Sequence, residues 1–107
     1  MIVSISQIRT GIVRYVEQEI AAKAVDIDKF KINFVLPRIP KIIDKMFLQY
    51  KDNELFKHYF DENGNINLDE LYNDAKNAAK KTGKFNLSGI IFSEDDFVKM
   101  YDYIKNV

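Results

Sequence analysis

The sequence predicts a mainly α-helical fold of four to five helices with one C-terminal β-hairpin, formed by residues 1–107 as a single domain. Apolar residues recur every three or four positions along most of the chain, which is the spacing of one helix face. Ser or Asn stands three residues before Gln, Glu or Asp at three predicted helix starts, as in capping boxes. The 107 residues are 47% hydrophobic, which suffices for one core but not for two domains.

The first helix is predicted to begin after Ser4, which has the capping-box spacing to Gln7. Gly11 lowers the helix propensity without ending the helix. We expect the helix to fade over residues 24–28, where Asp side chains can start a new element. Its buried face is formed by Ile5, Ile8, Ile12, Val16 and Ile20.

Residues 29–36 fit two kinds of secondary structure. Phe30, Ile32 and Phe34 occupy alternate positions, as in a half-buried strand. Phe30 and Phe34 are also four residues apart, which places them on one face of a helix. We favour the helix. A strand at 29–36 would make the fold α+β and would present an edge that recruits other chains.

Two prolines mark the next boundary. Pro37 has no backbone N–H and disfavours helical geometry at Leu36, so the chain should bend there. Pro40 suits the first turn of a further helix, where a missing donor costs nothing. That helix is expected to end near residues 52–53. Its buried face is formed by Ile39, Ile43, Met46, Phe47 and Tyr50.

A turn is predicted at residues 61–65, because Gly64 tolerates the left-handed geometry that most residues avoid. A helix should follow, with Asn67 and Glu70 at capping-box spacing and Gly83 as a left-handed stop. The apolar stripe of this helix is narrow and rich in Ala.

Residues 85–92 have the pattern of a short β-hairpin around a Ser88-Gly89 loop. Two strands of this length are marginal alone, so we expect them to pack on the flanking helices. A last helix should begin after Ser93, which has the cap spacing to Asp96. Its inner face is formed by Phe97, Met100, Tyr101 and Ile104.

The composition excludes several classes of function. Lys and Arg number 16 and Asp and Glu number 16, so the chain lacks the net positive charge of nonspecific nucleic-acid binders. It contains no cysteine, and therefore no disulfide, thiolate zinc site or cysteine nucleophile. Neither a membrane-length apolar run nor an export signal is evident. We expect a protein of the bacterial cytoplasm or of a virion, with neither nucleic acid nor a membrane as its partner.

Residues 59–70 resemble a degenerate EF-hand loop. If Gly64 is the turn glycine, Asp61, Asn63 and Glu70 occupy the third, fifth and twelfth loop positions. The first position is Tyr59, however, whose neutral phenol cannot replace the usual aspartate ligand. Two interpretations follow: weak calcium binding through Asp61, Asn63 and Glu70, or an ordinary Asp- and Asn-rich turn before a capped helix. We favour the turn.

No residue pattern predicts catalysis or a cofactor. His58 is the single histidine, which excludes a site with two histidine ligands, and no nucleophile motif accompanies it. The four glycines are too scattered for a phosphate-binding loop. We therefore expect a non-enzymatic protein without a cofactor, in which His58 is a solvent-facing or packed side chain.

The aromatic residues are the strongest functional signal. The chain has 8 Phe and 6 Tyr, more than one small core is expected to enclose, and aromatic side chains grouped on a surface mark partner sites. A basic face beside them could meet an acidic partner, but we favour a solvated face over a core helix for those residues: Lys29, Lys31, Arg38, Lys41 and Lys45. The predicted partner-binding residues are Phe30, Phe34, Phe47, Tyr50, Phe56 and Tyr59.

Four segments resemble small prophage-encoded proteins of unknown function from low-GC Gram-positive bacteria: RYVEQEI, LPRIPKIIDKM, DENGNINLDELYNDAKNAAKKTGKF and GIIFSEDDFVKMYDYI. The resemblance implies a phage-derived setting and carries over no site residues. Proteins of that kind often bind other proteins, as virion components or as modulators of host machinery. We therefore expect a protein-interaction or assembly module whose partner is a phage or host protein or a second copy in a homo-oligomer, with weak calcium binding as the alternative function.

Overall fold

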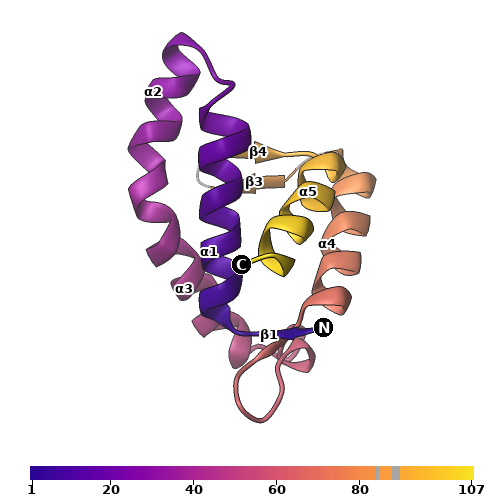
Figure 1. Cartoon of the computed structure of the whole chain (residues 1–107). Coiled ribbons are helices and arrows are strands. Elements are labelled where there is room, and N and C mark those ends of the chain that lie inside the picture. The colour runs from indigo at the N-terminus through magenta and orange to yellow at the C-terminus, as the bar shows by residue number, and fades with distance from the viewer. Residues whose placement is uncertain (84, 88–89) are drawn as a thin grey trace.

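The central helix of the computed structural model is α1 (Ile5–Tyr15), which packs against α5 (Glu94–Lys105) on one side and α3 (Ile39–Lys51) on the other (Figure 1). The structure describes residues 1–83, 85–87 and 90–107. A π-helical segment, η1 (Val16–Ala21), continues α1 without a break. The predicted first helix is thus confirmed, and it ends slightly earlier than expected.

The segment 29–36 is helical, so the strand alternative is wrong. It lies in α2 (Asp26–Val35), which a 3-10 turn, η2 (Leu36–Arg38), joins to α3 at the predicted proline boundary. A helix satisfies its own backbone hydrogen bonds, whereas a strand here would need a partner strand. Within α2, Ile32 is buried while the neighbouring Phe30 and Phe34 remain exposed.

All three predicted N-caps are present. The backbone N–H of Gln7 donates to the Ser4 hydroxyl at 3.0 Å, and Asn67 accepts the N–H of Glu70 in the same way at the start of α4 (Leu68–Thr82). At α5, Ser93 and Asp96 form a complete capping box. In the first two caps the third residue uses its side chain elsewhere, because the Gln7 amide donates to the Ile104 carbonyl and Glu70 faces His58.

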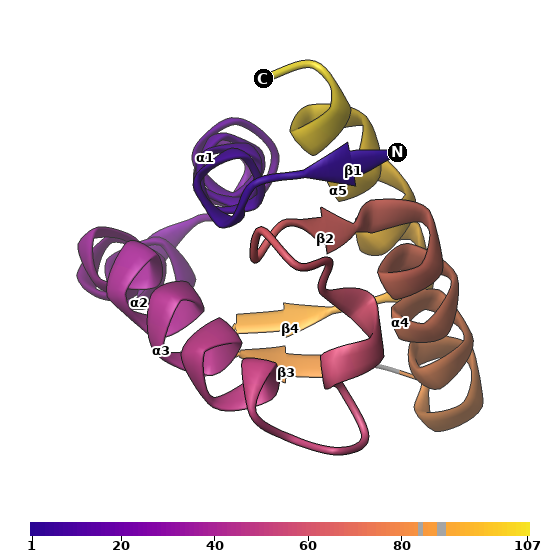
Figure 2. The same cartoon turned by 90° about the horizontal axis from the view of Figure 1, so that it is seen from below.

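Two small antiparallel strand pairs complete the part of the fold that the structure describes. The predicted hairpin is β3 (Phe85–Leu87) with β4 (Ile90–Phe92), and its Ser88-Gly89 loop lies outside the described residues. A second pair, β1 (Ile2–Val3) with β2 (Ile66–Asn67), ties the start of the chain to the start of α4 (Figure 2). This second pair was not predicted, because two-residue strands are too short to show an alternating pattern.

The connection between α3 and α4 contains the predicted turn and one short helix. After α3, the chain forms a 3-10 turn, η3 (Lys57–Tyr59), and then the turn at 61–65. Gly64 has a φ of 79°, and Gly83, which ends α4, has a φ of 85°, so both glycines adopt the left-handed geometry expected of them.

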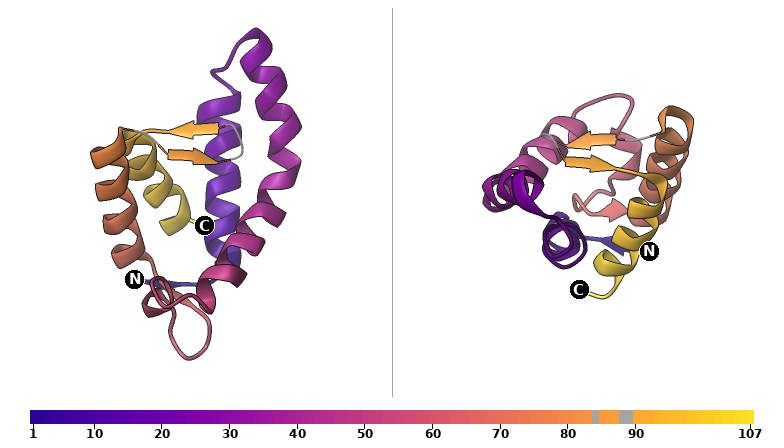
Figure 3. Two further views of the ribbon diagram at one scale, coloured as in Figure 1. Left: turned by 180° about the vertical axis from the view of Figure 1, so that it is seen from behind. Right: turned by 90° about the horizontal axis from the view of Figure 1, so that it is seen from above.

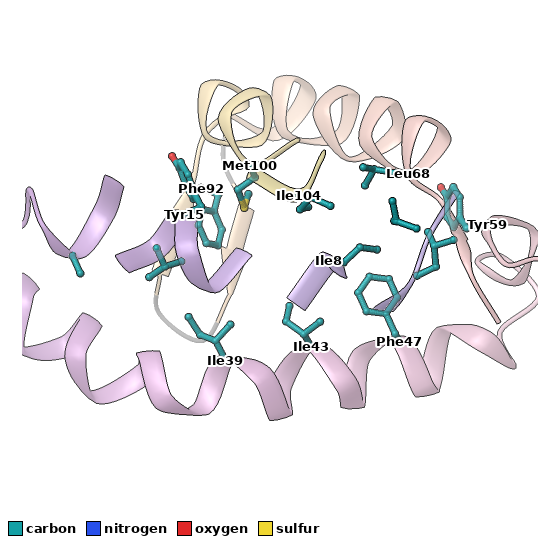
Figure 4. Packing of buried hydrophobic residues seen from close by; sticks show 14 of the residues in the cluster. Ile8, Tyr15, Ile39, Ile43, Phe47, Tyr59, Leu68, Phe92, Met100 and Ile104 are labelled. Carbon is teal, nitrogen blue, oxygen red and sulfur yellow. The ribbon is translucent and has the colours of Figure 1, made fainter. Parts of the chain in front are cut away.

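The core lies between α1, α3 and α5 and is closed by the hairpin (Figures 3 and 4). Among the described residues, the six largest fully buried side chains come from α1, η1, α3, β2 and β4: Ile8, Tyr15, Val16, Ile39, Ile66 and Phe92. Burial of such side chains is the main favourable term in folding. None of the described helices is long and apolar enough to cross a membrane.

Candidate functional site

An apolar groove of about 340 Å³ lies between α3 and α4, which stand on opposite sides of the molecule in Figure 2. Its floor is formed by side chains of α1 and α5. Ile8 and Ile104, both labelled in Figure 4, belong to that floor. Among the described residues that line the groove, Asp74 is the one with a charged side chain. A cavity of this size with so apolar a lining is typical of a binding site.

The wall on α4 combines small and large residues, because Ala75 and Ala78 stand beside Leu68, Leu71 and Tyr72. Ala75 and Ala78 line the groove, and Ala78 is exposed, so the groove reaches the surface there. Larger side chains at these positions would fill the space between α4 and α3. The Ala-rich stripe on α4 therefore leaves room beside the helix.

The opposite wall is aromatic. Tyr50 at the end of α3 stacks on Phe56 with ring centroids 4.4 Å apart, and Phe47 meets Tyr50 edge to face at 6.0 Å. Tyr59 extends the row, 6.4 Å from Phe56. Such ring pairs hold one another in place. The wall is therefore a preformed surface.

Four of the six predicted partner-binding residues are in this wall. Phe47 and Tyr59 are buried against the core, whereas Tyr50 and Phe56 are half-buried and face the groove. Much of the dense aromatic run therefore packs against the core. Of these four residues, the half-buried Tyr50 and Phe56 are the ones available to a partner.

The other two, Phe30 and Phe34, lie on α2 with exposed fractions of 75% and 59%. Arg38 continues the same helix face, because its guanidinium lies 4.0 Å from the centre of the Phe34 ring and donates to the Phe34 carbonyl. Lys29 and Lys31 are exposed beside them. We call these five residues the α2 face: Lys29, Phe30, Lys31, Phe34 and Arg38.

A polar cluster lies at the edge of the groove. The Tyr59 hydroxyl donates to Asp74 Oδ2 at 2.5 Å, and the His58 ring lies against the Tyr59 ring with centroids 4.1 Å apart. His58 Nε2 is 3.3 Å from Glu70 Oε1. Burial, together with the hydrogen bond to Asp74, raises the pKa of Tyr59 to about 12.

The structure divides the predicted calcium ligands between two places. The Asp61 carboxylate accepts the backbone N–H groups of Asn63 and Asn65, each at 2.9 Å, which is the turn interpretation of this segment. Glu70 lies instead with His58 and Asp74, and each of these three residues offers a ligand atom within 4.8 Å of the others. Asp61 belongs to no such group of three among the described residues.

Asp74, Ala75 and Ala78 were not predicted as site residues. One signal was present: Glu70 and Asp74 are four residues apart on a predicted helix, which places them on one face. The position of His58 opposite that face could not be predicted, because it depends on how the chain between α3 and α4 folds back.

Comparison with known proteins gives no relative: no family model, no curated protein and no solved structure matches the chain.

Proposed function

We propose that this protein is a non-enzymatic interaction module that self-associates, with the α2 face of one copy docked in the apolar groove of another. The observation that carries the proposal is the open groove between α3 and α4, a large apolar concavity at the surface of a small domain. The choice of a second copy as the occupant rests on two features of the α2 face, its size and its charge.

The two exposed phenylalanines suit the groove in size. A cavity of roughly 150 Å³ holds one benzene ring, and the groove has about 340 Å³. Phe30 and Phe34 are one helical turn apart on α2, so both rings can enter one groove together. This is the usual way in which an amphipathic helix docks in a hydrophobic groove.

The charges of the two surfaces are complementary. The α2 face carries three positive side chains around its two rings, Lys29, Lys31 and Arg38. Asp74 lines the groove, and a carboxylate oxygen of Glu70, one turn earlier on α4, lies within 4.8 Å of one of its oxygens. Opposite charges around an apolar contact speed association and fix its orientation.

The position of α2 leaves its outer face accessible. Its described contacts with the rest of the chain are mainly with η1 and η2, and the η1–α2 end of the molecule projects beyond the hairpin in Figure 1. A contact between different surfaces of identical copies builds rings or open chains unless two copies exchange the contact reciprocally. An assembly role of this kind agrees with the phage-derived setting implied by the resemblance.

The test is complementation between two variants. Phe30→Ser/Phe34→Ser removes the docking rings, and Ala75→Phe fills the groove. Each variant alone should be monomeric by sedimentation velocity, while the wild type self-associates. An equimolar mixture should form a heterodimer, because one variant keeps an intact groove and the other an intact α2 face.

The matched control is Leu55→Ser, which removes a side chain that is 76% exposed but belongs to neither surface. It should self-associate as the wild type does. A wild type that stays monomeric at millimolar concentration, a mixture that stays monomeric, or a control as defective as the double variant would each refute the proposal.

A further inference from the structure

We propose that His58, Glu70 and Asp74 form a binding site for a divalent transition-metal ion of the zinc type. The three residues come from two elements, η3 and α4, and are brought together by the fold. Their ligand atoms lie within 4.8 Å of one another, and one is an imidazole nitrogen. The site is distinct from the 59–70 calcium loop considered from the sequence, with which it shares Glu70 alone.

The spacing of the donor atoms suits a tetrahedral ion. Zinc binds nitrogen and carboxylate oxygen at roughly 2.0–2.1 Å, so two ligands of a tetrahedral zinc ion are about 3.3 Å apart. The observed distance from His58 Nε2 to Glu70 Oε1 is 3.3 Å. Asp74 completes the triangle with a small side-chain rotation, since its ligand oxygen is at most 4.8 Å from the other two atoms.

The ligand types favour a transition metal over calcium. Calcium takes six to eight oxygen ligands, whereas this site offers three side chains and one of them is a nitrogen donor. Imidazole suits zinc, copper, nickel and iron, and a site with three protein ligands leaves a position open to water or to a partner's side chain.

Two neighbouring contacts hold the ligands in place before any ion arrives. The Tyr59 hydroxyl donates to Asp74 Oδ2, which leaves the other carboxylate oxygen for the metal. The Tyr59 ring also supports the His58 ring, with centroids 4.1 Å apart. Hydrogen bonds to metal-binding carboxylates orient them, and loss of such a contact typically weakens metal affinity roughly 10- to 100-fold.

The arrangement of Glu70 and Asp74 is also favourable. Both are on α4, four residues apart, so a single helical turn presents two carboxylates to one ion. Two adjacent carboxylates repel each other, and a bound cation removes that repulsion. The half-exposed side chains of His58 and Glu70, at 49% and 43%, leave the site open to ions from solvent.

The experiment is calorimetric titration of the full chain with zinc chloride, accompanied by the visible spectrum of the cobalt(II) complex. We expect one ion per chain and the intense d–d absorption of a four-coordinate cobalt ion. His58→Ala and Asp74→Asn should each weaken zinc affinity about 100-fold or more, and Tyr59→Phe about 10-fold. Circular dichroism would verify that each variant is folded.

Two control variants distinguish zinc binding at this cluster from zinc binding at nearby carboxylates. Glu62→Gln removes an exposed carboxylate outside the cluster, and Asp61→Asn removes one of the three predicted calcium ligands, which also lies outside the cluster. Both should bind zinc as the wild type does. No heat at millimolar zinc, or an affinity that His58→Ala leaves unchanged or that Glu62→Gln lowers equally, would overturn the inference.

The zinc site and the docking proposal share the carboxylates of Glu70 and Asp74, so zinc binding is also measured on the two docking variants, which keep both carboxylates. The groove variant Ala75→Phe retains all three ligands, and the double variant Phe30→Ser/Phe34→Ser changes residues on a different element. If docking fails while these variants still bind zinc, the docking proposal is refuted and the metal site is retained. If zinc binding fails while complementation succeeds, only the metal site is refuted.

Discussion

Tyr59 joins the core, the groove and the polar cluster. The residue is 8% exposed and belongs to the aromatic wall, while its hydroxyl donates to Asp74. Burial and this hydrogen bond both favour the neutral phenol over the charged phenolate, which is why the pKa of Tyr59 is raised to about 12. The raised pKa makes stability depend on pH in the alkaline range.

The pH dependence predicts the behaviour of Tyr59→Phe. In the unfolded chain the phenol ionises near its ordinary pKa of 10.0, and in the folded protein near 12. Between these values the unfolded chain has lost a proton that the folded protein keeps, so the free energy of unfolding falls as pH rises. The stability advantage of wild type over Tyr59→Phe should be full below pH 10.0 and shrink by about 2–3 kcal/mol toward pH 12.

Urea unfolding of both proteins at several pH values on either side of 10 measures this difference. Comparison with Tyr59→Phe cancels the contribution of the other tyrosines. A stability difference that stays constant across the alkaline range would show that the Tyr59 hydroxyl does not have the environment described here.

Among the described elements, α1 and α5 make the most extensive contact. A Cβ atom built on Gly11 of α1 would lie 2.5 Å from Ile104 Cα and 2.5 Å from Ile104 Cγ1 of α5. Backbone atoms cannot move aside as a flexible side chain can, so only glycine allows the two helices to approach this closely. From the sequence alone Gly11 was merely a weak point in a helix.

Gly11→Ala tests this packing, because helix propensity and the contact between α1 and α5 predict opposite changes in the free energy of unfolding. In an exposed helix, replacing Gly by Ala stabilises by about 1 kcal/mol. Here we expect a loss of about 2 kcal/mol or more, since the added methyl group forces α1 and α5 apart. Asn77→Ala, at an exposed position of α4, is the control and should not destabilise.

Thermal unfolding monitored by circular dichroism measures both variants. A Gly11→Ala protein at least as stable as the wild type would mean that the helices are further apart than described.

In the whole molecule, the two surfaces proposed to dock on each other lie in different places. The molecule measures 44 × 28 × 25 Å, with the α2 face toward one end and the groove between α3 and α4. If copies associate through these surfaces, folding and association are coupled, because only folded chains present both surfaces.

This coupling predicts that the Tm of the wild type rises with protein concentration, as it does for any protein stabilised by association. The rise should be smaller at high salt, where the attraction between the basic α2 face and the acidic groove edge is screened. Differential scanning calorimetry over a wide range of concentration measures it. Phe30→Ser/Phe34→Ser should show a Tm independent of concentration, and an equal rise in that variant would contradict the prediction.

Several inferences from the sequence stay predictions. They are the prophage resemblance, the absence of catalysis, calcium binding, the localisation and the oligomeric state. The structure confirms the predicted helices and the hairpin. It also confirms that Phe30 and Phe34 belong to a helix, in which they lie one turn apart on the same face. For the candidate site, the sequence identified four residues that line the groove, but it did not show that two of them, Phe47 and Tyr59, would be buried while Tyr50 and Phe56 stay half-buried. Aromatic composition predicts the amount of apolar surface but not its distribution between core and exterior.

The sequence by itself determined the local structure of this protein: the caps at Ser4, Asn67 and Ser93 and the left-handed glycines at the turns. These features depend on interactions between residues a few positions apart, which the order of amino acids specifies directly. Only the tertiary structure decided that β1 pairs with β2, that α3 and α4 leave a groove between them, and that His58 meets Glu70 and Asp74. Those outcomes depend on how distant segments share the burial of apolar surface, which is a property of the whole chain.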